Sequence, residues 1–335
     1  MTYDTGFIRD GKISREHFDP DVVRRELAII RDDLHCTAVQ LIGGDPERLE
    51  LAARHAAGLG LEVWFSPYPL DLASAEMLAL FADCARRAER IRQSGADVVF
   101  VAGVELTVMS NEFLPGEDPM ARVGALLSEP GERSTRILEL SERLNEFLGA
   151  AVTEIRAHFR GKLTYAAIPF ERVDWTLFDI MSVELIRTAE VAGQYRDGVR
   201  QLVAQSLPVA ITGFGAATWH GAADVAARSM EIVEYGEGGE PIRLTGSYAR
   251  DEQGQAQYLR ELLEIFELEG VDSAFVFLFA LENFPHRPDG DPRDDLDLAS
   301  LGIVKVLEGR SGTTYPGLGW EPKAAFRAVA ESYSG

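Results

Sequence analysis

The stretch DVVFVAGVE, from Asp97 to Glu105, is an unbroken apolar segment between two carboxylates. A strand with one face in water alternates apolar and polar residues, whereas a strand of a parallel sheet is covered on both faces and is apolar throughout. The segment is therefore predicted to be a buried strand of a parallel sheet. Its last residue, Glu105, is then a carboxylate at the carboxyl end of that strand.

Short apolar runs of the same kind recur along the chain, and amphipathic segments separate them. The further predicted strands are TYDTGF (2–7), TAVQLIG (37–43), LEVWFSP (61–67), KLTYAAI (162–168), FDIMSVE (178–184), LPVAITGFG (207–215) and SAFVFLFAL (273–281). The predicted helices are 19–34, 45–60, 73–95, 136–159 and 256–270. Asp19 and Asp45 are expected to be N-caps, because a proline follows each of them. The second helix is expected to end at Gly58 or Gly60.

About eight strand–helix units predict an α/β fold of the (β/α)8 TIM barrel class, built as a single domain over residues 1–335. A doubly wound open sheet is the competing fold, but it usually carries a glycine-rich phosphate turn after its first strand, and this chain has none there. Two long loops are expected, Val108 to Glu132 after the fourth strand and Glu282 to Pro322 after the eighth. Both follow strand carboxyl ends, where barrel enzymes place their active sites.

The composition is that of a folded, acidic protein, and it limits the partners. A net charge of -21 argues against nucleic acid, since phosphate binding needs a basic face. No apolar run reaches the roughly 18 residues of a membrane span, and the first residues do not resemble a signal peptide, so we expect a cytoplasmic protein. Cys36 and Cys84 lie within apolar patterns and are expected to be buried free thiols. Nothing in the sequence indicates an oligomeric state.

Three carboxylates are expected at strand ends. Glu105 is a candidate general acid because partial burial raises the pKa of a carboxyl group, although an ion pair with an arginine at the barrel rim remains an alternative. Glu184 ends the sixth strand, and Arg187 follows three residues later, so a role in the site and a simple ion pair between them both stay open. Glu282 follows the eighth strand.

Aromatic residues near the same strand ends suggest a sugar-binding surface, because apolar sugar faces pack on aromatic rings. A single tryptophan is more often part of a core, but several in one region favour this interpretation. The residues are Trp64, Tyr68, Trp219 with its neighbour His220, Tyr315 and Trp320.

Two sets of residues could form a metal site. Glu105, Glu184, His220 and Glu282 offer the ligands of a Mg²⁺ or Mn²⁺ site, as in a metal-dependent sugar isomerase or epimerase. They show no diagnostic close spacing, so neither a metal nor a cofactor is predicted. The acidic stretch PDGDPRDDLDL (288–298) lacks the spacing of a calcium loop and is expected to be a solvated loop with helix-capping aspartates.

Two strand ends resemble those of the clan-A retaining glycoside hydrolases. VELT (104–107) matches the end of their fourth strand and implies that Glu105 is the acid/base residue, although Val104 stands where Asn is common. ITGFG (211–215) resembles the seventh-strand segment ITEFG, with Gly213 at the position of the nucleophilic glutamate. The resemblance implies a barrel that acts on a small-molecule or oligosaccharide glycoside by the retaining, double-displacement mechanism.

Nearly the whole chain also resembles an actinobacterial group of barrel proteins labelled abortive-infection or hydrolase-like. The shared motifs are YDTG (3–6), IRDDLHC (30–36), LEVWFSP (61–67), GVELT (103–107), DLDLASLGIVK (295–305) and YPGLGWEPK (315–323). Asp4 of the first motif completes the expected substrate-binding set, which is Asp4, Trp64, Tyr68, Glu184, Arg187, Trp219, His220, Glu282 and Trp320.

Gly213 leaves three interpretations open, because it has no side chain that could attack an anomeric carbon. It can replace a catalytic glutamate in an engineered variant, which is then inactive or of the glycosynthase type. It can mark natural repurposing, in which Glu184, Glu282 or the substrate itself does the work, or in which the barrel binds sugars or serves biosynthesis without hydrolysis. It can also be a close-approach glycine in an unrelated barrel.

Overall fold

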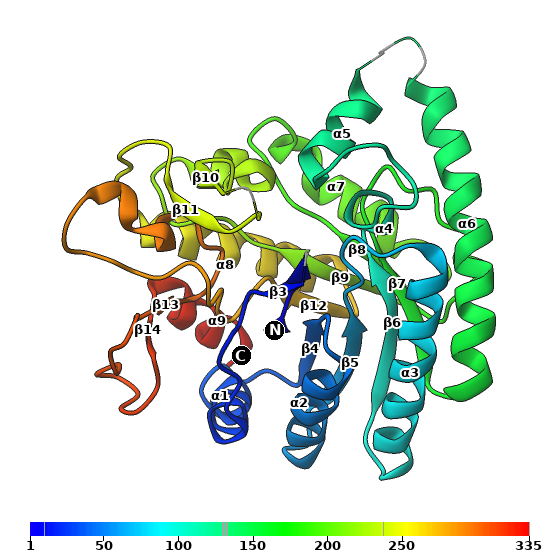
Figure 1. The fold of residues 1–335 in the computed structure, drawn as a ribbon, viewed down its shortest axis with the longest axis horizontal. Coiled ribbons are helices and arrows are strands. Elements are labelled where there is room, and N and C mark those ends of the chain that lie inside the picture. Colours follow the sequence, from blue (N-terminus) through cyan, green and yellow to red (C-terminus); the bar gives the residue numbers. More distant parts are fainter. Residues whose placement is uncertain (10, 129–130, 132, 237, 335) are drawn as a thin grey trace. The chain divides into compact units, whose positions relative to one another are not determined.

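The main sheet has eight strands in the order β1-β4-β5-β6-β7-β8-β9-β12, with helices between them along the chain (Figure 1). The computed structural model describes residues 1–9, 11–128, 131, 133–236 and 238–334. The pairs β4–β5, β5–β6, β6–β7, β7–β8 and β9–β12 are parallel. The predicted (β/α)8 fold class is confirmed.

Every predicted strand is present, because a continuous apolar run is a strong signal for a strand covered on both faces. The strands are β1 Thr2–Gly6, β4 Ala38–Gly43, β5 Glu62–Pro67, β6 Val98–Val104, β7 Lys162–Ala167, β8 Met181–Glu184, β9 Val209–Phe214 and β12 Ser273–Val276. The last strand is shorter than predicted, because it ends at Val276 rather than at Leu281.

The five predicted helices are α1 Pro20–Asp32, α2 Pro46–Gly58, α3 Ser74–Gln93, α6 Arg133–His158 and α8 Glu252–Glu269. The carboxylate of Asp45 caps α2 as predicted, accepting hydrogen bonds from the backbone N–H groups of Glu47 at 2.8 Å and Arg48 at 3.3 Å. Four helices were not predicted: α4 Leu106–Met109, α5 Pro119–Leu127, α7 Ala192–Val203 and α9 Ala324–Tyr333.

Both predicted long loops contain structure of their own. The end of α4 and the whole of α5 lie in the loop expected from Val108 to Glu132, of which residues 129, 130 and 132 lie outside the described residues. The loop after β12 contains the short helices η3 Pro292–Asp294 and η4 Leu296–Ala299 and the hairpin-like pair β13 Val304–Val306 with β14 Trp320–Pro322. The other two-stranded sheets are β2 Ile8–Arg9 with β3 Lys12–Ile13, and β10 Val233–Tyr235 with β11 Pro241–Leu244.

The chain divides into two compact units. The β4–β8 unit contains 5–20 and 38–184, and the β9–β12 unit contains 1–4, 21–37 and 185–335. That both belong to one domain stays a prediction. Cys36 and Cys84, one in each unit, are free and buried as expected. Among the described residues, no helix has the length and apolar character needed to cross a membrane.

In the β4–β8 unit, helices α2, α3 and α6 cover one face of the parallel strands (Figure 1). Phe65 and Phe100 stack on this face with their ring centroids 6.1 Å apart, and the edge of Phe81 from α3 packs on Phe100. Side chains alternate along a strand, so the neighbours of these residues point to the opposite face. On that face the hydroxyl groups of Thr164 and Ser182 lie 2.7 Å apart.

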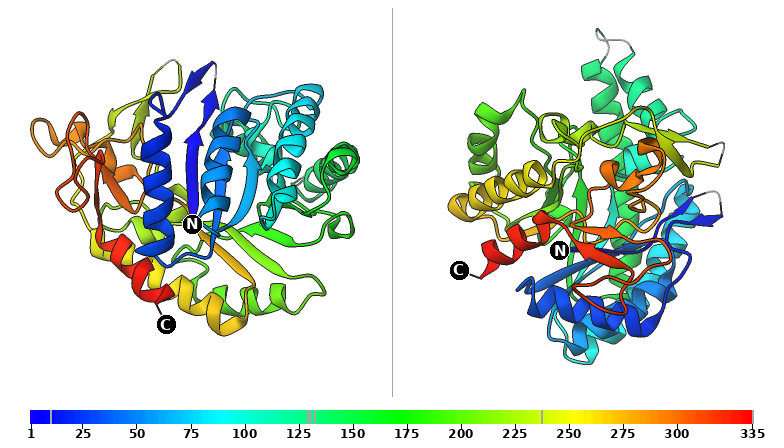
Figure 2. Two further views of the ribbon diagram at one scale, coloured as in Figure 1. Left: turned by 90° about the horizontal axis from the view of Figure 1, so that it is seen from below. Right: turned by 90° about the vertical axis from the view of Figure 1, so that its left-hand side faces the viewer.

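In the β9–β12 unit, the parallel strands β9 and β12 pack against the long helix α8, through contacts such as Phe214 on Phe266. Helices α7 and α9 flank α8, and Figure 2 shows α9 alongside it. Residue Gly213 lies buried near the end of β9, and its carbonyl accepts a hydrogen bond of 3.1 Å from the backbone N–H of Leu185.

Candidate active site

Glu105 lies at the point where β6 ends and the short helix α4 begins. Its backbone is left-handed, with φ 47° and ψ 41°, and its N–H donates a 2.9 Å hydrogen bond to the carbonyl of Ala166 in β7. A left-handed conformation in a residue other than glycine costs about 1–3 kcal/mol and persists only where surrounding contacts enforce it. It turns the chain out of the strand and leaves the Glu105 side chain, which is partly buried, at the strand end.

A buried hydrogen-bond network enforces this turn. The hydroxyl of Tyr165 accepts a 2.8 Å hydrogen bond from the backbone N–H of Leu106 and donates one of 2.9 Å to Glu171. The same oxygen of Glu171 accepts hydrogen bonds from the backbone N–H of Thr107 at 3.1 Å and from its hydroxyl at 2.6 Å. Together these bonds satisfy the N–H groups that the first turn of α4 leaves unpaired. Tyr165 and Glu171 therefore position Glu105.

The sequence carries little signal for this network. Tyr165 lies in a predicted strand and Glu171 lies in a loop after it, with no pattern that links either residue to Glu105. Glu171 is only 7% exposed, and its carboxylate accepts several hydrogen bonds, so it anchors the turn. These contacts can be recognised only in the folded structure.

The surroundings of Glu105 favour the protonated form of its carboxyl group. Burial raises its pKa well above the usual value, and the nearby charges of Glu184 and Glu171 add to the effect. Burial also raises the pKa of Glu171, although hydrogen bonds donated by Thr107 and by the backbone N–H of Ile168 lower that pKa in part. A carboxyl group that keeps its proton at higher pH is suited to donate that proton to a leaving group.

Tyr68 and Glu184 belong to the same cluster. Tyr68 follows β5, and its ring packs edge-on against Phe7 with centroids 5.4 Å apart. Burial and the charges of Glu105 and Glu184 raise the pKa of the Tyr68 hydroxyl well above its usual value, and the charge of Arg9 partly opposes them. The structure therefore brings together three of the predicted site residues: Glu105, Glu184 and Tyr68.

A buried arginine holds the loop beside this cluster. Arg122 of α5 has no exposed surface, and its guanidinium donates hydrogen bonds to the carbonyls of Val108 at 2.9 Å and Gly116 at 3.1 Å. It also forms a 2.9 Å ion pair with Asp71, whose other oxygen lies 2.9 Å from Arg9. The described arginines near this loop, Arg9 and Arg122, thus pair with Asp71 rather than with Glu105.

Two of the tryptophans predicted to bind sugar are core residues. Trp64 has an exposed fraction of 0%, and its indole N–H donates a 2.5 Å hydrogen bond to Glu62. Trp320 is also buried, its indole N–H donates to Glu26 at 2.9 Å, and its ring packs on Phe279. The prediction needs correction for these two residues, because neither ring offers a free face on which a sugar could stack.

Arg187, Trp219 and His220 lie in the β9–β12 unit, each with partners of its own. Arg187 forms an ion pair of 2.6 Å with Glu261, a partner that the sequence did not indicate. The indole N–H of Trp219 donates to the carbonyl of Ser229 at 2.9 Å and leaves the ring partly exposed. The side chain of His220 is 81% exposed and lies 3.2 Å from Asp251. The same unit contains Asp4, which is buried, and Glu282, which is partly buried.

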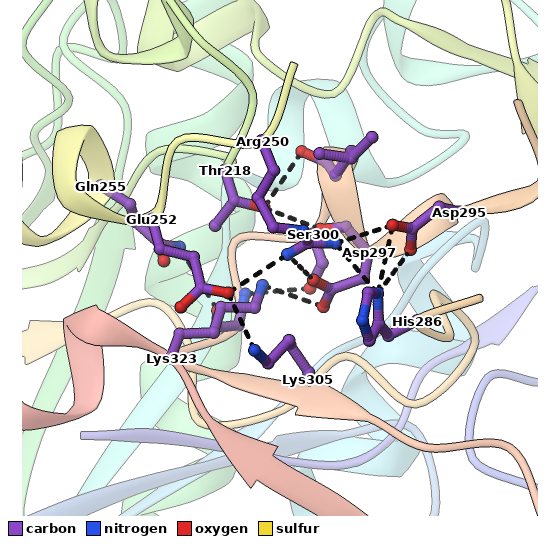
Figure 3. Close-up of polar contacts among 12 residues, drawn as sticks. Thr218, Arg250, Glu252, Gln255, His286, Asp295, Asp297, Ser300, Lys305 and Lys323 are labelled. Atoms are coloured by element: carbon purple, nitrogen blue, oxygen red, sulfur yellow. Dashed lines mark hydrogen bonds and ion pairs between the residues drawn. The ribbon is translucent and has the colours of Figure 1, made fainter. Parts of the chain in front are cut away.

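The acidic stretch 288–298 takes part in a buried ion-pair cluster (Figure 3). Asp297 is held by Lys323 at 2.9 Å and by Arg250 at 2.7 Å, and Asp295 is held by Arg250 and His286, both at 2.9 Å. Burial raises the pKa of Asp295, but the hydrogen bonds from His286 and Arg250 outweigh it and lower that pKa to about 2.

The expectation of a solvated loop is therefore wrong for Asp295 and Asp297, which are buried. It is right for capping, because Asp291 caps η3 by accepting a hydrogen bond of 3.0 Å from the N–H of Arg293. The cluster joins the motif 295–305 to Lys323, the last residue of the motif 315–323. Across the described parts of the chain, no group of three or more His, Cys, Asp or Glu side chains is arranged to hold a metal ion.

The sequence matches no protein-family model and no curated protein. Its fold is similar to that of a GH113 β-1,4-mannanase, with a TM-score of 0.61 and 14% identity over 100% of both chains. A GH113 β-mannanase from Alicyclobacillus acidocaldarius has a TM-score of 0.58 and 14% identity, over 100% of this chain and 96% of the other. A family 1 β-glucosidase from Thermotoga maritima has a TM-score of 0.57 and 13% identity, over 99% and 96%. The chain thus shares the (β/α)8 fold of solved glycoside hydrolases.

Proposed function

We propose that this chain is a glycosidase-type barrel that acts on a small-molecule or oligosaccharide glycoside, with Glu105 as the proton donor. The observation that carries the proposal is the Glu105 carboxyl group itself. It lies at the end of the fourth strand of the sheet, its turn is held by Tyr165 and Glu171, and its pKa is raised. The fold shared with mannanases and a β-glucosidase supports the choice of substrate class.

In the proposed reaction, the Glu105 carboxyl group transfers its proton to the glycosidic oxygen as the bond from that oxygen to the anomeric carbon breaks. In a retaining enzyme, a second carboxylate attacks the anomeric carbon and forms a covalent glycosyl intermediate. We assign the position of that nucleophile to residue 213, near the end of the seventh strand of the sheet. Because Gly213 has no side chain, the chain is inactive in the retaining route or is of the glycosynthase type.

The test is to restore the side chain. Gly213→Glu is expected to hydrolyse activated aryl glycosides with retention of the anomeric configuration, measured on a panel that varies the sugar. Gly198→Glu is the matched control, because it adds the same charge to the same unit at a site in α7 where an added side chain meets open space. If Gly213→Glu folds, binds sugars and cleaves nothing on the panel, the assignment of residue 213 fails.

A sugar-binding barrel without turnover is the second candidate, and Gly213 itself favours it. In that case the wild-type chain and Gly213→Glu both bind saccharides in calorimetry, and neither releases an aglycone.

A further inference from the structure

The strand register brings Glu105 and Glu184 to the same end of the sheet within the β4–β8 unit. Val104 of β6 lies level with Ala166 of β7, and Ala166 lies level with Ser182 of β8. Glu105 is the next residue after Val104, and Glu184 lies two residues beyond Ser182. Only β7 separates their two strands.

The side chain of Glu184 lies on the face of the sheet opposite the helices. Phe100 packs against Phe81 and Phe159, so Phe100 and its strand neighbour Leu163 belong to the face that the helices cover. Thr164 is next to Leu163 and therefore points to the other face, where its hydroxyl meets that of Ser182. Side chains two residues apart on a strand point to the same face, so the side chain of Glu184 lies on the same face as that of Ser182.

We propose that Glu184 is the general base of this site, paired with Glu105, and that the chain with Gly213 hydrolyses glycosides with inversion at the anomeric carbon. The inference rests on the proposed function for the role of Glu105 as proton donor. It does not use residue 213.

The separation of the two strands suits this chemistry. Two strand spacings of about 4.8 Å put the two main chains about 10 Å apart. Inverting glycosidases hold their two carboxyl groups roughly 6.5–9.5 Å apart, so that a water molecule fits between base and sugar. The side chains of Glu105 and Glu184 are close enough for their charges to interact, and both act on the hydroxyl of Tyr68.

The reaction balances with water as the only co-reactant. Glu184 takes a proton from the water as the water oxygen forms its bond to the anomeric carbon. The glycosidic C–O bond breaks, and Glu105 gives its proton to the departing oxygen. The proton on Glu184 then returns to Glu105 through solvent, and the sugar product has the opposite anomeric configuration.

The experiment follows product stereochemistry by proton NMR during cleavage of aryl glycosides by the wild-type chain. We expect slow hydrolysis with inversion, a loss of at least about 100-fold in Glu184→Gln, and no loss in the exposed Glu146→Gln control. Azide needs no deprotonation, so it should restore cleavage in Glu184→Gln and give the inverted glycosyl azide. A purely structural role for Glu184 predicts no such rescue. Glu184→Ala is the second variant if Glu184→Gln does not fold by circular dichroism.

Several results would overturn the inference. The first is a product of the wild-type chain with retained anomeric configuration, and the second is full activity in Glu184→Gln. The last is a wild-type chain that cleaves none of the substrates that Gly213→Glu cleaves. The last result contradicts the role of Glu184 and leaves the proposed function standing. If the wild-type chain hydrolyses with inversion and Gly213→Glu is inactive, the roles of Glu105 and Glu184 are supported. The assignment of residue 213 as the nucleophile position then fails.

Discussion

The hydroxyl of Tyr165 donates a buried hydrogen bond of 2.9 Å to the carboxylate of Glu171. Both side chains bind the first residues of α4, and so they fix the left-handed turn at Glu105. A proton donor loses rate when it is displaced by even 1 Å, so in the proposed reaction this anchor matters for catalysis as well as for stability.

Replacing Tyr165 with Phe should weaken this anchor. The change leaves the backbone N–H of Leu106 without its partner, and we expect the free energy of unfolding to fall by about 1–3 kcal/mol in urea titrations. In the Gly213→Glu background, kcat should fall more than KM rises, because Glu105 is misplaced for proton transfer. Tyr333→Phe removes a comparable hydroxyl, bonded to the carbonyl of Ala274, and should leave kcat unchanged. Equal kcat in both variants contradicts the anchor.

Arg122 should be essential for the order of the loop between β6 and α6. Arg122→Met removes a fully buried charge from Asp71 and from two backbone carbonyls, and we expect a loss of about 3–5 kcal/mol in the free energy of unfolding. Hydrogen exchange of residues 108–127 should accelerate. Arg143→Met, at an exposed arginine that also binds backbone carbonyls, should cost under about 1 kcal/mol. If hydrogen exchange of these residues is unchanged in Arg122→Met, Arg122 is not what orders the loop.

The buried pair of Asp297 and Lys323 should behave as one unit in a double-mutant cycle. Lys323→Met leaves a buried carboxylate with one cation fewer, and Asp297→Asn leaves a buried ammonium, so each is expected to cost about 3–5 kcal/mol in urea unfolding. The double variant should lose less than the sum of the two. The solvent-exposed pair of Arg31 and Asp32 is the control, for which no measurable coupling is expected. Additive losses at Asp297 and Lys323 contradict the coupling.

The pH dependence of kcat/KM should report the proton on Glu105. In Gly213→Glu, activity requires protonated Glu105 and therefore falls as the pH rises through its raised pKa. Removing the negative charge of Glu184 lowers that pKa, so Glu184→Gln in the same background should move the alkaline fall to lower pH. Glu146→Gln, at an exposed position on α6, should leave it in place. A shift to higher pH has the wrong sign for charge repulsion.

The sequence was most informative where residues follow the period of one element. The eight strands could be predicted because each is an apolar run covered on both faces, and α2 because Asp45 and a proline mark its start. Helix α7 was missed because Gly193 and Gly198 lie within it, and glycine inside a helical pattern weakens the prediction of a helix.

The site was predictable only in part, for a related reason. Glu105 and Glu184 could be found because they end apolar strands. The partners of Asp297 could not, since Arg250 lies 47 positions away in the chain and nothing in an acidic run indicates burial. Trp64 shows a second limit of prediction from the sequence. The alternation of side chains along a strand predicts on which face a residue lies, but whether its ring reaches solvent depends on its depth in the fold.

The most direct test of the central claim is the effect of Glu105→Gln on substrates with different leaving groups, measured as kcat/KM in the Gly213→Glu background. Proton donation matters most for a poor leaving group, so the loss should reach about 100- to 10,000-fold for an alkyl glycoside and should be small for a dinitrophenyl glycoside. A plot of log kcat/KM against leaving-group pKa should therefore steepen in Glu105→Gln. Equal losses for both substrates, with an unchanged slope, would contradict the role of Glu105 as the proton donor.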